Sequence, residues 1–168
     1  MPSTRFPTRI GDCTVEWHDR GLVAFNLPES PRFDTSNPTL PRLPSGDPAI
    51  DDLIVRVRQH LAGEPQDFAD LRFDWDQVTD FRAKVLRAVL AVRPGTTATY
   101  GELAQTIGAA PGACRAIGGA VGANPWPLLV PCHRILGQGR KLTGYSAPGG
   151  TTTKQHLLEM EGVELLRA

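Results

Sequence analysis

The sequence predicts an α+β protein with a small N-terminal α/β domain over residues 1–76 and a mainly helical domain over residues 77–168. Two observations lead to this prediction. The first part holds a strand-hairpin pattern and one helical pattern, whereas the second part holds four successive helical patterns. With 168 residues, 40% of them hydrophobic, the chain can also bury a core in one large or two small domains.

The N-terminal part begins with a predicted hairpin over residues 14–27. Residues 28–48 hold six prolines and are expected to be mostly loop. A helix should follow, with Asp47 as its N-cap, Pro48 in its first turn and Gly63 at its end. Beyond it, apolar and charged residues alternate, which predicts a strand or an extended linker. The apolar positions are Ile50, Leu53, Ile54, Val57 and Leu61 in the helix and Leu71, Phe73 and Trp75 in the extended segment.

Two helical patterns open the C-terminal part. The first runs from a cap at Thr79 to Pro94-Gly95. The second is opened by a T-x-x-E capping box, formed by Thr99 and Glu102, and is closed by Gly108. Their predicted inner faces are Phe81, Val85, Ala88, Val89 and Val92 in the first helix and Leu103, Ala104 and Ile107 in the second.

A third helix is predicted over residues 111–123, with Cys114, Ile117 and Val121 on its inner face. With the preceding helix it forms a helix-turn-helix pattern, which many proteins that never touch DNA also contain. Outside the inner face it is nearly all Gly and Ala, and Arg115 is its only charged residue. Tight helix packing would explain the small side chains. Docking into a groove of DNA would explain both the small side chains and the single cation.

A glycine-rich loop over residues 144–150 leads to the last helix, which is expected to begin at Thr152 or Thr153 and to end at Gly162. The loop lacks the glycine spacing of a phosphate-binding loop. It is therefore either a plain connector or a wall that approaches a substrate closely.

The most informative motif is Pro131-Cys132-His133-Arg134. A thiol beside an imidazole is the minimum equipment of a nucleophilic cysteine, because the imidazole can take the thiol proton. The alternative is a buried structural thiol, a common fate of a free cysteine and our interpretation of Cys13 and Cys114. Three cysteines without framework spacing favour a reducing, cytoplasmic location with free thiols.

Charge is distributed unevenly along the chain, although the net charge is zero. Residues 1–77 carry 8 Arg against 13 Asp and Glu and have a net charge of −5, whereas residues 78–168 have a net charge of +5. This asymmetry fits a basic half that meets a polyanion, or ordinary surface variation. No apolar run is long enough to cross a membrane, and the first ten residues do not resemble a signal peptide.

Several of these motifs, in order and across roughly residues 79–162, resemble those of the O6-alkylguanine-DNA alkyltransferase family. Residues 1–75 match that family only loosely. The resemblance implies a ribonuclease H-like N-terminal domain and a winged-helix-like C-terminal domain. The motifs are Thr99-Tyr100-Gly101-Glu102-Leu103-Ala104, Cys114-Arg115-Ala116-Ile117-Gly118-Gly119-Ala120, Asn124-Pro125, Pro131-Cys132-His133-Arg134 and Leu157-Leu158-Glu159-Met160-Glu161-Gly162.

The resemblance implies single-turnover repair of duplex DNA. The alkyl group of a flipped-out O6-alkylguanine, and of O4-alkylthymine, would pass to Cys132 without a cofactor. His133 would deprotonate the thiol through a water, and Glu161 would orient the imidazole, as the acid does in a catalytic triad. The remaining catalytic residues implied are Asn124, in the hinge before the cysteine, and Tyr100 and Lys154, near the leaving base, with Tyr100 protonating guanine N3.

The resemblance also implies a DNA-binding set and a substrate pocket. The helix of residues 111–123 would enter the minor groove, and Arg115 would fill the space left by the flipped base. The DNA-binding residues would be Arg115, Thr99, Tyr100, Ala116, Gly119 and Arg134, and the pocket residues would be Tyr145, Ser146, Val130 and Pro131. The loop of residues 144–150 is two residues longer than the common form, which leaves the preferred alkyl group open.

We expect no metal site, because Cys13, His18, His60 and His156 do not reproduce the zinc-ligand spacing of some family members, and the histidines are better explained as isolated surface residues. We expect a monomer in solution, with cooperative binding on DNA as an open question. Three alternatives remain: a lesion sensor without activity, a methylation-responsive regulator and a cysteine hydrolase. The presence of Cys132 opposes the first, the short chain opposes the second, and the lack of an oxyanion-hole motif opposes the third.

Overall fold

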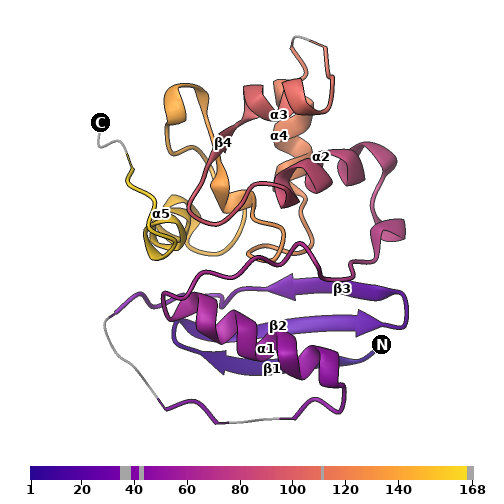
Figure 1. Cartoon of the computed structure of the whole chain (residues 1–168), viewed down its shortest axis with the longest axis vertical. Coiled ribbons are helices and arrows are strands. Elements are labelled where there is room, and N and C mark those ends of the chain that lie inside the picture. Colours follow the sequence, from indigo (N-terminus) through magenta and orange to yellow (C-terminus); the bar gives the residue numbers. More distant parts are fainter. Residues whose placement is uncertain (35–38, 42–43, 111, 166–168) are drawn as a thin grey trace.

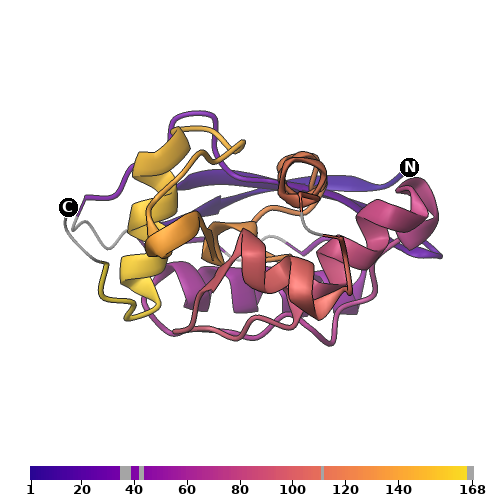
Figure 2. The ribbon, with the colours of Figure 1, turned by 90° about the horizontal axis from the view of Figure 1, so that it is seen from above.

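The computed structural model describes residues 1–34, 39–41, 44–110 and 112–165 and confirms a mixed α+β fold. A three-stranded sheet crossed by helix α1 forms the N-terminal half, and helices α2–α5 dominate the C-terminal half (Figure 1). The view from above shows α5 and α2 at opposite ends of the molecule, with α3 and α4 between them (Figure 2).

The sheet is antiparallel in the order β1-β2-β3. Strands β2 (Gly11–His18) and β3 (Gly21–Asn26) are the predicted hairpin. Strand β1 (Ser3–Thr8) was not predicted, because Arg5 and Pro7 mask its alternation, yet its edge position tolerates the proline. The side chains of Phe6, Val15 and Phe25 point to the core.

Helix α1 (Pro48–Leu61) packs against this sheet with the apolar face that its spacing predicts. Asp47 is the N-cap and accepts a hydrogen bond from the Ala49 backbone N–H. The extended segment that follows pairs with β3, because Phe73 forms a parallel bridge with Leu22. The prediction of an extended segment is thus confirmed around Phe73, whereas Trp75 begins a 3₁₀ turn.

The C-terminal half begins with the short turn η1 (Trp75–Gln77) and helix α2 (Asp80–Leu90), which Thr79 caps as predicted. Two-residue strands β4 (Ala98–Thr99) and β5 (Ile135–Leu136) pair in parallel. Helices α3 (Tyr100–Thr106) and α4 (Cys114–Gly122) pack together and give the expected helix-turn-helix arrangement. Turns η2 (Cys132–Arg134) and η3 (Gln138–Arg140) precede helix α5 (Gly150–Met160).

One hydrophobic core runs through both halves. Trp126 is fully buried, and its ring lies 5.0 Å from Phe73 and 5.2 Å from Trp75. Its Nε1–H donates to the Leu22 carbonyl across the two halves, as the Phe25 N–H donates to the Pro125 carbonyl. The proposed division at residues 76 and 77 stays a prediction.

Four local predictions are wrong. Phe81 is 41% exposed, because the inner face of α2 is rotated to Val85, Leu86 and Val89. Cys114 is exposed at the first position of α4, and the start predicted at Pro111 lies outside the described residues.

The other two concern caps. The predicted capping box is formed only in part. The Thr99 hydroxyl accepts from the Glu102 N–H and caps α3, but the Glu102 carboxylate accepts from Arg140. Helix α5 was expected to begin at Thr152 or Thr153, but its N-cap is Gly149. Gly149 adopts a left-handed backbone conformation with φ of 88°, and a Cβ added there would collide with Thr153. Among the described residues, no helix has the length and apolar character needed to span a membrane.

Candidate active site

Cys132 opens the turn η2, and its side chain is placed by the apolar hinge that precedes it. The residue is 3% exposed, and its backbone N–H donates to the Val130 carbonyl at 2.8 Å. Asn124 ties the hinge together, since its Nδ2 donates to the same Val130 carbonyl and its Oδ1 accepts from the Trp126 N–H, both at 2.9 Å. Leu128 adopts a positive φ of 78°, a strained backbone conformation for leucine. The surrounding core, in which Leu128 is fully buried, holds it in this conformation.

Behind the cysteine, His133 and Arg134 both bind the carboxylate of Glu161, the residue that ends α5. His133 Nε2 is hydrogen-bonded to Glu161 Oε1, and Arg134 Nε donates to both carboxylate oxygens at 2.8 and 3.1 Å. Arg134 Nη1 also donates to the Val92 carbonyl at 2.7 Å. All three side chains are buried, so the cluster works in a low-dielectric environment.

His133 is held as a neutral base. Burial lowers the pKa of His133, and the Glu161 carboxylate only partly offsets this effect. Burial opposes ionisation of Glu161, but contacts with His133, His60 and Arg134 outweigh it and lower the pKa of Glu161. His133 Nδ1 has no hydrogen-bond partner among the described residues, so this nitrogen is the one available to take a proton.

The thiol itself is protonated at rest. Burial raises the pKa of Cys132, while Asn124 and the Lys154 cation act in the opposite direction. Lys154 is buried, and burial lowers its pKa from 10.5 to about 8. Its Nζ donates to the carbonyls of Thr143 and Gly144 at 3.3 and 3.4 Å, and both of these residues line the same pocket as Cys132.

A pocket of about 450 Å³ opens in front of Cys132, large enough for a small ligand. Tyr100 contributes from α3, and burial raises its pKa. Burial, followed by the nearby Cys132, raises the pKa of Tyr145 well above its usual value. The lining consists of Tyr100, Gly118, Val121, Gly122, Cys132, Thr143, Gly144, Tyr145 and Ser146.

The outer face of α4 is open rather than packed. Arg115, Ala116 and Gly119 are exposed, and a Cβ placed on Gly119 or Gly122 would meet nothing within 4 Å. Tight packing therefore does not explain these glycines. They leave a shallow, nearly side-chain-free surface beside the pocket, with one cation on it.

The structure corrects three of the predicted roles. Arg134 was predicted to bind DNA, but it is buried and its guanidinium is occupied by Glu161 and Val92. Val130 and Pro131 are buried and do not line the pocket, where glycines and Thr143 take their place. The loop of residues 144–150 does supply a pocket wall through Tyr145 and Ser146.

The interpretation of the remaining histidines as isolated surface residues also fails in part. His60 is 1% exposed and belongs to the Glu161 cluster. Cys13 lies in the core, as its interpretation as a structural thiol predicts. His18 is partly buried and binds Asp74. His60 was missed because nothing near it in the sequence distinguishes it from any other helix residue.

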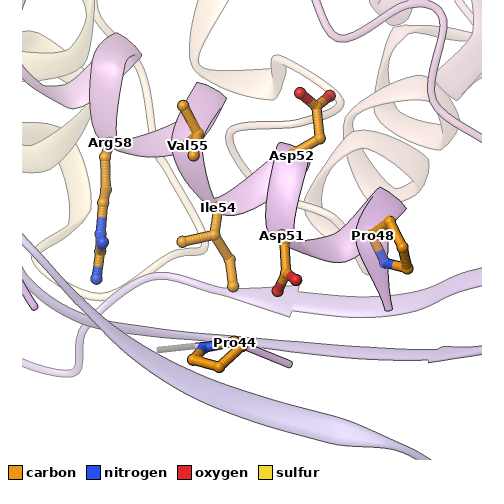
Figure 3. A pocket seen from close by; sticks show the side chains of 7 residues that line it. All are labelled: Pro44, Pro48, Asp51, Asp52, Ile54, Val55 and Arg58. Atoms are coloured by element: carbon orange, nitrogen blue, oxygen red, sulfur yellow. The ribbon is translucent and has the colours of Figure 1, made fainter. Parts of the chain in front are cut away.

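A separate hollow lies between α1 and Pro44, and Pro48, the first residue of the helix, also lines it (Figure 3). Asp51 points from α1 toward Pro44, and Arg58 points toward the sheet, where its Nε donates to the Pro7 carbonyl (Figure 3). None of the predicted site residues lines this hollow. The chemistry therefore belongs to the Cys132 pocket.

Sequence comparison places this architecture among known proteins. Residues 80–163 match the family model described as 6-O-methylguanine DNA methyltransferase, DNA binding domain. A methylated-DNA–protein-cysteine methyltransferase of Mycobacterium bovis is 38% identical over 152 residues, covering 90% of this chain and 87% of the relative. One from Methanothermobacter thermautotrophicus is 36% identical over 154 residues, covering 92% and 81%.

Solved structures agree with the sequence matches. Mycobacterium tuberculosis OGT in complex with DNA superposes with a TM-score of 0.76 at 37% identity, covering 96% of this chain and 93% of that one. The O6-methylguanine-DNA methyltransferase of Pyrococcus kodakaraensis gives a TM-score of 0.64 at 27% identity, covering 96% and 99%.

A helix-turn-helix beside a buried cysteine, histidine and glutamate defines an enzyme of direct-reversal DNA repair. The chain belongs to the methylated-DNA–protein-cysteine methyltransferase family.

Proposed function

We propose that the chain binds duplex DNA, rotates an O6-alkylguanine out of the helix and moves the alkyl group to Cys132 Sγ, once per protein molecule. The observation that supports this best is the Cys132 thiol at the floor of a pocket, with an unpartnered His133 nitrogen next to it in the chain. O4-alkylthymine presents the same kind of alkyl–oxygen bond and is proposed as a second substrate.

The bond from the alkyl carbon to guanine O6 breaks as the bond to sulfur forms. The thiol proton passes through a water to His133 Nδ1, and Glu161 stabilises the resulting imidazolium. Because burial raises the pKa of the thiol, this proton leaves during the transfer rather than before it. Tyr100 protonates guanine N3 as the base leaves and recovers its own proton from solvent. The thioether product is stable, so each protein molecule transfers one alkyl group and is then inactive.

The surface of α4 supports a role in DNA binding. Its open glycine face allows a phosphate backbone or groove wall to come close. Arg115 is exposed near the start of α4, and we propose that it replaces the flipped base in the stack. Thr99, the N-cap of α3, and Ala116 and Gly119 of α4 are proposed as accessory contacts. Binding should weaken as salt rises, since phosphate contacts release counterions.

Finer assignments belong to the same proposal. We propose a ribonuclease H-like origin for the sheet with α1, and a winged-helix-like arrangement for α3, α4 and the paired strands β4 and β5. We also propose a monomer in solution and a cytoplasmic location, where Cys132 stays reduced. An inactive lesion sensor is disfavoured because Cys132 is present.

The proposal is tested with duplex DNA that carries radiolabelled O6-methylguanine. Wild type should take up label to a plateau of one methyl group per protein molecule, and Cys132→Ala should take up none while still binding DNA. Label that stays on the DNA with wild type, or equal transfer by Cys132→Ala, would refute it.

A further inference from the structure

His60 of the N-terminal half reaches the Glu161 carboxylate, at the same oxygen that His133 binds. It lies on the last turn of α1 and is 1% exposed. Its Nε2 lies 3.7 Å from Glu161 Oε1, the same oxygen that His133 binds. Helices α1 and α5 pack together and bring these residues, about a hundred positions apart in sequence, into one cluster.

The tautomer of His60 follows from its other nitrogen. The Gln66 backbone N–H donates to His60 Nδ1 at 2.9 Å. The neutral ring therefore carries its proton on Nε2, the atom that faces Glu161. The ring is further fixed against Phe68, with 5.6 Å between ring centroids.

The His60 N–H has no other partner. Nε2 is buried and makes no hydrogen bond to any described residue. A separation of 3.7 Å is too long for a full hydrogen bond, but in a buried site the attraction between an N–H and a carboxylate remains substantial. Glu161 Oε1 thus faces N–H groups of His133, Arg134 and His60 together.

We propose that His60 is a positioning residue for alkyl transfer: it keeps the Glu161 carboxylate ionised and aimed at His133, and so makes the N-terminal half part of the catalytic relay. The inference rests on the proposed function. During transfer His133 becomes an imidazolium, and a carboxylate that faces several N–H groups at one oxygen is held in place beside it. His60 touches neither substrate nor cysteine.

Two substitutions separate the two contacts of His60. Asn places an oxygen near the Nδ1 position and keeps the bond from Gln66, but it cannot reach Glu161. Gln places an amide N–H near the Nε2 position and keeps a donor for Glu161. His60→Asn should slow transfer at saturating DNA about tenfold, as loss of an outer partner of a working histidine commonly does. His60→Gln should recover the wild-type rate to within about threefold.

His18 supplies a matched control in the same half. Its Nδ1 accepts from the Arg20 N–H at 3.0 Å, and its Nε2 pairs with Asp74 at 2.8 Å, so the pattern of contacts is the same. His18→Asn should lower the melting temperature but leave the transfer rate unchanged. DNA affinity should be equal in all of these variants.

The inference is overturned if His60→Asn and His60→Gln both transfer at the wild-type rate, or if both slow equally and in step with lost stability. It is also overturned if wild type binds one Zn²⁺ that His60→Asn does not, and a chelator speeds transfer, because His60, His133 and Glu161 would then be metal ligands. Failure of wild type to label Cys132 would instead refute the proposed function.

Discussion

At the scale of single residues, the buried carboxylate of Glu161 determines what the site can do. It accepts from Arg134 and His133 and faces His60, so its negative charge is balanced inside the protein rather than by water. Such an ion pair adds little net stability by itself, but removing one partner leaves an uncompensated charge.

Glu161→Gln should therefore lower the free energy of unfolding by about 3 kcal/mol near neutral pH. The folded-state pKa of Glu161 lies below its ordinary value of 4.5, so the stabilising contribution of the carboxylate is present above that pH and is lost as the pH falls below it. Denaturant unfolding should show the gap between wild type and variant narrowing in acid. Glu159→Gln, on the exposed side of α5, is the control and should change stability by less than about 0.5 kcal/mol. A gap that stays constant with pH would contradict this account.

The reacting pair could be predicted from a local motif and Glu161 from the family resemblance, whereas the contacts of His60 and Arg134 with Glu161 could not. Cys132 and His133 are adjacent, so a local motif reveals them. His60 approaches Glu161 only because α1 packs against α5. Arg134 points into the protein because its guanidinium donates to the Glu161 carboxylate. Neither contact leaves a trace in residue spacing.

At the scale of elements, α4 combines an apolar inner face with an outer face that is nearly bare. Ile117, Ala120 and Val121 are buried, while Arg115 stands exposed near the start of the helix. The glycines of this outer face lower the intrinsic stability of the helix, but they also let a partner surface approach its backbone.

Arg115→Ala should weaken binding to duplex DNA modestly and slow repair of duplex DNA more strongly. Transfer from a free alkylated guanine base should be unchanged, because the cysteine and its relay are intact. Arg20→Ala, which removes the same charge from the hairpin turn of the N-terminal sheet, is the control for net charge. Equal losses with the free base and the duplex would exclude a role in base flipping.

Helices with strong caps or regular spacing were predictable, and their exact faces were not. Asp47 and Thr79 cap α1 and α2 as their residue types indicate. Phe81 was assigned to the core by spacing alone, but it lies in the first turn of α2, and the buried face of the helix consists of Val85, Leu86 and Val89. The start of α5 depends on the left-handed Gly149, which outweighs the threonine caps.

At the scale of the whole molecule, the two halves share one core. Trp126 of the C-terminal half packs against Phe73 and donates a hydrogen bond to the Leu22 carbonyl. The hinge before Cys132, which begins at Asn124, lies beside this contact. The N-terminal half is therefore a support for the active-site hinge as well as for Glu161.

Unfolding should accordingly occur in a single cooperative transition. Tryptophan fluorescence reports on Trp17 in the sheet and on Trp75 and Trp126 at the shared core, and far-ultraviolet circular dichroism reports mostly on the helices. The two signals should have coincident midpoints in denaturant. Two separated transitions would show that residues 1–76 and 77–168 are independent domains.

The central claim, that Cys132 is the alkyl acceptor, is tested most directly by peptide mass spectrometry after incubation with an excess of duplex O6-methylguanine DNA. The account predicts one added methyl group per molecule, located on the peptide that contains Cys132 and absent from those with Cys13 and the exposed Cys114. A methyl group on another residue, or continued turnover with Cys132 unmodified, would contradict it.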